Sequence, residues 1–470
     1  MPDRHLTDPA DLDRAPAHAV VAAIAAGRLS ARAACEAAIA RIERLDGAIN
    51  AVVVRDFDRA LAQADAADAA LARGERRPLL GLPMTVKESY NVAGLPTTWG
   101  VPAFRDFRPT EDAVAVSRLK AAGAVILGKT NVPPLLADWQ ADNPIHGRTV
   151  NPHDPTRSPG GSSGGGAAAL ASGMVALELG SDTGGSIRTP AALCGVFGHK
   201  PTHGLVPSRG HAFPGTDGAA VELAVCGPLA RTAEDLDLAL AVVAGPDLDD
   251  ATGYRLALPP PRAGIAGCRV LALRSHPVAP TDALIRAGID RASAALRAAG
   301  ASVADESPLL PDLAAAHAGY MGLLLAIVSR GPKPVPGTIS AHDWLGLLDQ
   351  RERLRRGWRA LFKQFDVVIA PAFGSVAFAH LGPATNPAPD TRTLRINGIE
   401  TPYFDQLGWP GVATYPGLPA TAVPVNRSPE GLPVGLQVIG PVLRDRDTIA
   451  VAGWLHALTL GADDDGVVRR

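Results

Sequence analysis

A glycine- and serine-rich segment, residues 158–202, constrains the fold of this chain more than any other stretch: SPGGSSGGGAAALASGMVALELGSDTGGSIRTPAALCGVFGHKPT. It contains two Gly/Ser turns, at 160–166 and 184–186, and we expect a small-residue helix and a short apolar strand between them. Glycine allows positive φ and close approach to a ligand, and successive N–H groups in such a turn form a cup for an anion. Since each turn also presents a hydroxyl, the segment is suited to acyl transfer, in which those N–H groups stabilise an oxyanion.

Such chemistry needs a base, and Lys87 is the best candidate. It follows Met84 and Val86 in the segment GLPMTVKESYNVAGLPTTWG, which holds no other Lys or Arg. An ordinary lysine has a pKa of about 10.4, but burial disfavours the charged form and lowers this value by several units. The segment reads as a short strand leading into a loop, so we expect Lys87 at a strand end, facing the interior.

The Lys87 segment, the Gly/Ser block and a late GLPVGLQVIGP segment occur in the order found in the amidase signature family, which the chain resembles through most of its length. Ser162 lies 75 residues after Lys87, and Ser186 lies 24 residues after Ser162, which also fits that family. The resemblance implies that Ser186 is the nucleophile, Lys87 the base, and Ser162, held by a cis peptide bond, the proton relay. It further implies an oxyanion hole made by the main-chain N–H groups of Thr183, Gly184, Gly185 and Ser186.

This resemblance implies an amidase that hydrolyses the C–N bond of a small molecule to a carboxylic acid and an amine or ammonia, through an acyl-enzyme on Ser186. Side activity on esters, anilides or carbamates is open, and no metal, nucleotide or redox cofactor is expected. The alternative within the family is the catalytic A-type subunit of a tRNA-dependent amidotransferase. Thr414 and Pro416 depart from that subunit's pattern, while Glu88 and His203 stand where Asp and Tyr are common in the family.

Several residues are candidates for substrate binding. Leu136, Ala137 and Trp139 match a region that lines the acyl pocket in relatives, with core packing as an equal alternative. In some relatives the arginine that matches Arg188 binds a substrate carboxylate. The alternative role for Arg188 is an ion pair with Asp182 that holds the loop. An aromatic late segment suggests an apolar acyl or amine group; it contains Tyr403, Phe404, Trp409 and Tyr415.

Two other residues, Ser163 and Cys194, are candidate nucleophiles. Residues 161–165, GSSGG, fit the nucleophile elbow of an α/β-hydrolase with Ser163 as nucleophile and His380 as a possible triad partner, but PTRSPGG upstream is no strand. We expect Ser163 instead to cap a helix over 164–172. Cys194 lies near the serines, and its alternative interpretation is a small buried hydrophobic residue.

Composition limits the partners and the compartment. With 45 basic and 47 acidic residues, the net charge of −2 gives no reason to expect nucleic acid or an anionic membrane as a partner. The N-terminal residues lack the apolar core of a secretory signal, so we expect a cytoplasmic protein, with a homodimer as the working expectation for its assembly. The apolar run 313–328 is shorter than the roughly 20 residues of a spanning helix, which favours a core or pocket-lining helix.

Alternating strand and helix patterns predict an α/β fold, in which helices cover both faces of a sheet. The family resemblance implies a single large domain, 1–470, with a mixed twisted β-sheet. Residues 1–76 form a helical outer layer, with Ser30 as an N-cap, 77–245 the core with the catalytic residues, and 264–470 the remainder of the same sheet and the pocket loops. Residues 247–267 are expected to form a surface connection, and 385–400 a loop. Residues 268–306 are expected to form a β–α–β unit, and Thr232 and Asp235 have capping-box spacing.

Overall fold

In the computed structural model the described residues are 12–216, 218–329, 338–382, 391–461 and 467–468. One sheet of 11 strands runs through them, in the order β1-β3-β2-β6-β8-β7-β14-β15-β11-β9-β10. These strands are β1 (Val52–Arg55), β2 (Pro83–Lys87), β3 (Val125–Thr130), β6 (Leu177–Asp182), β7 (Phe197–Lys200), β8 (Val225–Ala230), β9 (Arg269–Ala272), β10 (Ser302–Ala304), β11 (Val367–Pro371), β14 (Ala420–Arg427) and β15 (Pro433–Ile439). Neighbours are parallel in the pairs β2–β3, β2–β6, β9–β10 and β9–β11 and antiparallel elsewhere, so the predicted mixed sheet is confirmed.

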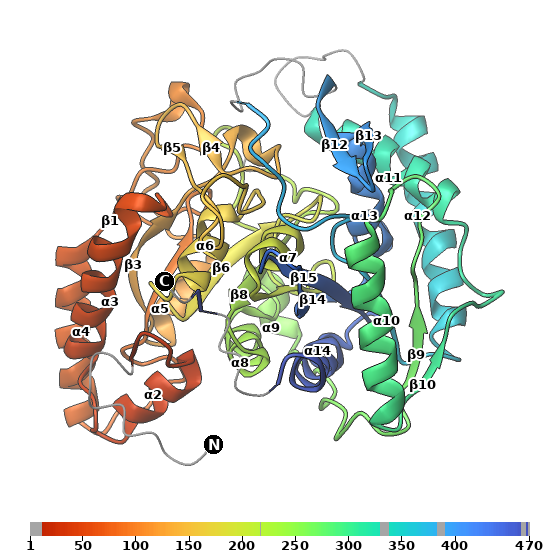
Figure 1. The fold of residues 1–470 in the computed structure, drawn as a ribbon. Helices are drawn as coiled ribbons and strands as arrows, with labels where there is room; N and C mark the ends of the chain where they lie inside the picture. The colour runs from red at the N-terminus through yellow and green to blue at the C-terminus, as the bar shows by residue number, and fades with distance from the viewer. Residues whose placement is uncertain (1–11, 217, 330–337, 383–390, 462–466, 469–470) are drawn as a thin grey trace.

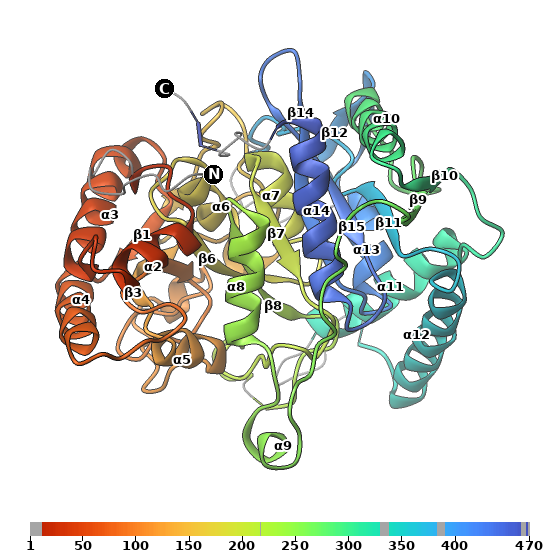
Figure 2. The same cartoon turned by 90° about the horizontal axis from the view of Figure 1, so that it is seen from below.

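Helices cover both faces of this sheet, also as predicted (Figure 1). One face carries α2 (Ala17–Ala25), α5 (Val114–Ala121), α8 (Ala233–Val243), α10 (Ala283–Ala298) and α14 (Asp445–Thr459), and Figure 2 shows α8 and α14 side by side. The other face carries α3 (Ala31–Leu45), α4 (Phe57–Ala72), α6 (Gly164–Ala171) and α7 (Arg188–Cys194). Successive strand side chains point to opposite faces, so Met84 and Val86 of β2 join the first core while Thr85 and Lys87 point to the second.

The remaining elements lie around the sheet. They include four helices: α9 (Leu248–Gly253), α11 (Leu313–Val328), α12 (Ala341–Leu361) and α13 (Gly408–Thr414). They also include two small hairpins, β4 (Asp142–Asn143) with β5 (Gly147–Arg148) and β12 (Thr393–Ile396) with β13 (Ile399–Pro402). Short 3₁₀ segments are η1 (Asp46–Ala48), η2 (Pro102–Phe104), η3 (Pro134–Leu136) and η5 (Tyr403–Leu407). Within the described ranges, no helix combines the length and the apolar character needed to cross a membrane.

Most local predictions hold. Ser30 caps α3 by accepting from Ala33 N, the β9–α10–β10 unit forms with parallel strands, and α11 coincides with the apolar run 313–328. The loop predicted over 385–400 is wrong where that segment is described: β12 and the first half of β13 lie in it, because Asn397 and Gly398 at positive φ form a tight two-residue turn. The connection 247–267 lies at the surface, as predicted, and contains the short helix α9, which Asp247 caps by accepting from Leu248 N at 2.9 Å.

A bulge in β3 sets the side-chain direction near its end. The register with β2 shifts between Met84 and Thr85, so Thr85 pairs with Gly128 and Lys87 pairs with Thr130. A Cβ at residue 128 would lie 2.1 Å from the Val54 carbonyl oxygen, so only glycine fits there. Because the bulge reverses the alternation, Thr130 points to the same face as Thr85 and Lys87.

Asp235 joins the helical outer layer to the core. Thr232 Oγ1 accepts from Asp235 N over 3.2 Å, as the capping-box spacing predicts. The Asp235 carboxylate, however, accepts from the first N–H groups of another helix, Ala17 N at 2.8 Å and His18 N at 2.7 Å. One buried side chain on α8 therefore caps α2 across 218 residues of sequence.

This arrangement predicts that Asp235→Ala lowers the free energy of unfolding by about 2–4 kcal/mol, since buried N–H groups lose a charged acceptor. Urea unfolding measures the loss. The matched control is Asp237→Ala on the same helix, whose carboxylate pairs with Arg446 at the surface and is worth about 0–1 kcal/mol. Equal losses in the two variants would contradict this role for Asp235.

Candidate active site

Lys87 ends β2 and is completely buried. Its Nζ donates to Ser162 Oγ at 2.7 Å, to Ser181 Oγ at 3.0 Å and to the Ser181 carbonyl oxygen at 3.4 Å. Burial lowers the pKa of the amine to about 7, against an opposing effect of the Asp182 carboxylate. A substantial fraction of this lysine is therefore neutral at physiological pH and able to accept a proton.

Ser162 and Ser186 lie on the two Gly/Ser turns, which the structure brings together. The Gly161–Ser162 peptide bond is cis, as the sequence resemblance implied, and Ser163 N donates to the Ser186 carbonyl oxygen at 3.1 Å. Lys87 and Ser162 have no exposed surface, whereas Ser186 is 8% exposed, so among these three residues Ser186 alone has surface open to solvent. Within the described ranges no hydrogen bond joins the Ser162 and Ser186 hydroxyls.

Asp182 organises the turn that carries Ser186. Its carboxylate accepts from Gly185 N at 3.0 Å, Ile187 N at 3.1 Å and Arg188 N at 3.3 Å. Burial alone would raise the pKa of Asp182, but the charge and hydrogen bonds of Arg188 outweigh it and bring the pKa to about 2. The Asp182 carboxylate at the centre of the turn is therefore charged, and Arg188 balances its charge.

Two aromatic residues hold the main chain of the turn from outside. Tyr320 OH donates to the Thr183 carbonyl oxygen at 2.8 Å, and Trp139 Nε1 donates to the Gly184 carbonyl oxygen at 2.9 Å. In a planar trans peptide the N–H points opposite to the C=O, so the Tyr320 bond fixes the direction of the Gly184 N–H. These two contacts orient the predicted oxyanion donors.

The four predicted donors are not equivalent. The Gly185 N–H already has the Asp182 carboxylate as its acceptor. The N–H groups of Thr183, Gly184 and Ser186 have no acceptor among the described residues. The group available to bind an oxyanion is therefore smaller than the sequence predicted, because the Asp182 side chain folds back into the turn.

Arg188 binds protein groups through its whole guanidinium. Its guanidinium is completely buried, and each of its five N–H donors has an acceptor. Nε and Nη2 donate to Asp182, Nη2 also to Thr414 Oγ1 at 2.7 Å, and Nη1 to Gln437 Oε1 at 2.7 Å and Pro410 O at 3.1 Å. The alternative interpretation, a structural ion pair with Asp182, is the one that the structure supports.

Of the predicted pocket residues, only Trp139 contacts the Ser186 turn through a hydrogen bond. Leu136 is half-buried and Ala137 is exposed, at the end of η3. Tyr415 is buried, but its hydroxyl donates to the Leu347 carbonyl oxygen at 3.2 Å, away from the turn. Sequence reasoning missed Tyr320 and Leu407, which lie against Gly184; the tyrosine in the apolar run 313–328 was the available signal.

The alternative nucleophiles are not supported. Ser163 lies at the N-cap position of α6 but does not cap it; its Oγ instead contacts Ser181 N and O, each at 3.4 Å, because this serine faces β6. His380 makes no contact with Ser163 in the described structure. Cys194 is buried, its Sγ donates to the Pro159 carbonyl oxygen, and burial raises the pKa of its thiol.

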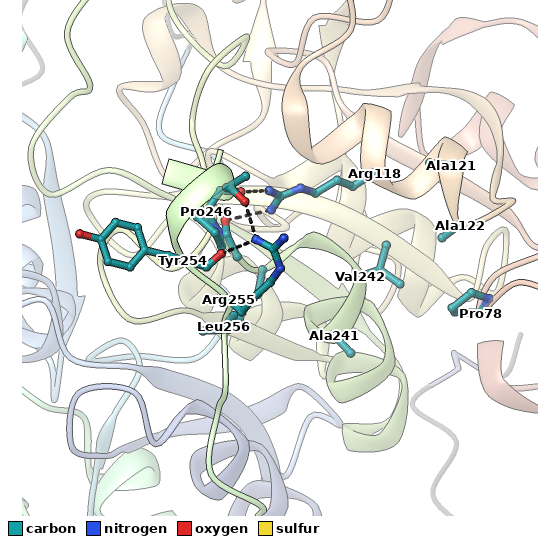
Figure 3. A pocket seen from close by; sticks show the side chains of 13 residues that line it. Pro78, Arg118, Ala121, Ala122, Ala241, Val242, Pro246, Tyr254, Arg255 and Leu256 are labelled. Carbon is teal, nitrogen blue, oxygen red and sulfur yellow. Dashed lines mark hydrogen bonds between the residues drawn. The ribbon is translucent and has the colours of Figure 1, made fainter. Parts of the chain in front are cut away.

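A cavity of about 530 Å³ lies elsewhere, beside α5, α8 and α9 (Figure 3). Lys87, Ser162 and Ser186 do not line this cavity. Arg118 points toward it and donates to the carbonyl oxygens of Val243 at 2.7 Å and Gly245 at 3.0 Å. No group of three or more potential metal ligands occurs in the described part of the chain.

Comparison with known proteins gives a consistent result. A family model described as Amidase matches residues 33–333 and 335–449. The chain is 36% identical to AtzE of Pseudomonas sp. (strain ADP), which is a subunit of 1-carboxybiuret hydrolase, over 96% of this chain and 98% of that protein. It is 35% identical to the A-type subunit of the glutamyl-tRNA(Gln) amidotransferase of Roseiflexus castenholzii, over 93% and 94%. A solved bacterial aryl acylamidase of the amidase signature enzymes family matches with a TM-score of 0.84 at 25% identity, over 98% and 100%.

The site geometry predicts that Arg188→Lys lowers the free energy of unfolding by about 2–3 kcal/mol, because a lysine cannot replace the forked contacts to Asp182, Thr414 and Gln437. Urea unfolding tests it, with Arg446→Lys, a surface residue paired with Asp237, as the matched control. Unchanged unfolding together with a raised KM would show instead that Arg188 binds substrate.

Proposed function

Because the chain belongs to the amidase family, and is thus a hydrolase of non-peptide carbon–nitrogen bonds, we propose that it cleaves a small-molecule amide through an acyl-enzyme on Ser186. Lys87 is the base in this proposal and Ser162 the relay. The observation that carries it is the 2.7 Å contact between the buried Lys87 Nζ and Ser162 Oγ, next to the turn that carries the partly exposed Ser186. A low-pKa amine linked to a hydroxyl chain is a suitable activator for a serine nucleophile.

In the first half-reaction Ser186 Oγ attacks the amide carbon while its proton passes to Ser162 Oγ, and the Ser162 proton passes to Lys87 Nζ. This step requires the Ser186 hydroxyl to turn toward Ser162. The same chain then returns a proton to the nitrogen of the departing amine as the C–N bond breaks. A water molecule, deprotonated by the same relay, hydrolyses the ester on Ser186 and releases the carboxylic acid.

Main-chain donors would stabilise the negative charge that develops on the amide oxygen. The Gly184 N–H is the best oriented, since Tyr320 holds its peptide unit, and the unpaired N–H groups of Thr183 and Ser186 lie on the same turn. Donors fixed before the reaction do not need to reorganise, and the loss of one typically costs a hundredfold or more in turnover, about 2.7–4 kcal/mol.

The surroundings of Trp139 favour an apolar group on the substrate. Its ring contacts Phe373 and Tyr403 edge-on, each at a centroid distance of 5.0 Å, and lies 6.0 Å from Phe404. The indole also binds the Ser186 turn directly. An aromatic wall beside the nucleophile supports an apolar acyl or amine moiety in the substrate.

The second candidate function is the A-type subunit of an amidotransferase, supported by the 35% identity to such a protein. The two functions differ in what the isolated chain does. Hydrolysis of p-nitroanilides or primary amides by the lone polypeptide supports the free-standing amidase. Activity that appears only with co-purifying partner proteins supports the amidotransferase assembly.

The mechanism predicts that Ser186→Ala and Lys87→Ala each lower kcat at least about a thousandfold while the fold persists. Initial rates on a panel of amides, with circular dichroism as the check on folding, measure this. The matched control is Ser172→Ala at the end of α6, whose hydroxyl bonds only the Ala168 and Ala169 carbonyl oxygens and whose loss leaves turnover unchanged. A folded Lys87→Ala protein with full activity at pH 7 would refute the assignment of the base.

The rate should also depend on pH in a defined direction. The neutral amine is the active form of Lys87, and its pKa is lowered to about 7, so kcat/KM rises as pH increases through about 7. A rate–pH profile from pH 5 to 10 tests this expectation. An ascending limb near pH 10, the range of an exposed lysine, would contradict the burial argument.

A further inference from the structure

Glu178 is a buried acid that the proposed reaction does not use. It lies in β6 with no exposed surface. Thr130 Oγ1 donates to its Oε1 at 2.7 Å, and Thr85 Oγ1 donates to its Oε2. Because the two threonines belong to β3 and β2, a single carboxyl group ties three adjacent strands together. A buried carboxyl is costly unless both oxygens are bound in this way.

Helix α6 is shaped to receive this carboxyl. A Cβ on Gly166 would lie 2.6 Å from Glu178 Cγ and 2.9 Å from Oε1, so a side chain at residue 166 and the carboxyl could not occupy this place together. Gly166 is in the first turn of α6, and Ser162 lies just before that helix. Glu178 therefore contacts the element that positions the proposed relay serine.

The partners of Glu178 also surround the proposed base. Thr85 lies two residues before Lys87 on β2, so their side chains share a face of the sheet. Thr130 is the residue of β3 paired with Lys87, and the bulge at Gly128 turns its side chain to that same face. The two hydroxyls that bind Glu178 thus flank Lys87 on both strands.

We propose that Glu178 is a positioning residue, which locks β2 and β3 against α6 and thereby keeps the Lys87 amine within reach of Ser162. The inference rests on the proposed function, because the contact that Glu178 maintains is the one between Lys87 and Ser162. Placement errors of about 1 Å in such a contact lower turnover by roughly a hundredfold.

Charge gives a second readout. The titratable groups around Lys87 are Glu178 and Asp182 on β6, Cys226 on β8, and His211, whose pKa is lowered by burial and by Lys87. An ionised Glu178 favours the protonated form of Lys87, while burial raises the pKa of Glu178 itself to about 8. Because that value lies above the pKa of Lys87, about 7, Glu178 is largely uncharged where Lys87 titrates, and an uncharged amide in its place leaves the titration of Lys87 nearly unchanged.

The test compares Glu178→Gln with Glu178→Ala. Glutamine has the size of glutamate and can bond both threonines, so kcat stays within about threefold of the wild type, and the ascending limb of the rate–pH profile stays near pH 7. Alanine leaves both hydroxyls unpaired and a void under α6, so kcat falls at least about tenfold with little change in KM. Glu36→Ala, an exposed acid paired with Arg32 on α3, is the control and changes neither quantity.

Three results would overturn the proposal. The first is wild-type kcat and an unchanged pH profile in Glu178→Ala. The second, which still decides the matter if the alanine variant does not fold, is an ascending limb in Glu178→Gln that moves by more than about one pH unit, because the charge of the acid rather than its contacts would then control the base. The third is a loss of turnover in Glu178→Gln as large as in Glu178→Ala, since charge rather than placement would then carry the effect. Lys87→Ala, assayed alongside, separates the two levels: if it stays active the proposed function fails, and if it is inactive only the role of Glu178 is in question.

Discussion

The structure depends on keeping one buried amine without a charge partner. Asp182 is the anion whose charge acts most strongly on Lys87, but its carboxylate is bound to Arg188 and to three main-chain N–H groups. Lys87 contacts only neutral oxygens, those of Ser162 and Ser181. An ion pair would hold the lysine protonated, so the separation of the two charges is what makes the amine available as a base.

That separation is built from segments distant in sequence. Arg188 reaches Asp182 on one side, and Thr414 of α13 and Gln437 of β15 on the other. Tyr320 of α11 and Trp139 hold the outer carbonyl oxygens of the same turn. The nucleophile turn is therefore fixed from within by the Asp182 carboxylate and from outside by hydrogen bonds from two aromatic side chains.

The sequence was informative where a local pattern determines the structure, and uninformative where the partner is remote. The apolar run before Lys87 predicted a buried strand end, and Ser30 predicted a helix cap; both depend on neighbouring residues. The sequence left two interpretations of Arg188 open because its acceptors other than Asp182 lie more than 220 residues away. The sequence also could not predict that the Gly185 N–H donates to Asp182 and is not free to bind an oxyanion. This contact depends on the conformation of the Asp182 side chain rather than on residue type.

The most direct test of the central claim is to follow the Lys87 amine itself. Lysine labelled with ¹³C at Cε gives one NMR signal for each side chain, and the signal missing from a Lys87→Met variant identifies residue 87. The account predicts that this signal titrates near pH 7 in the folded protein. A Lys87 signal that remains that of a charged amine up to about pH 10 would contradict it.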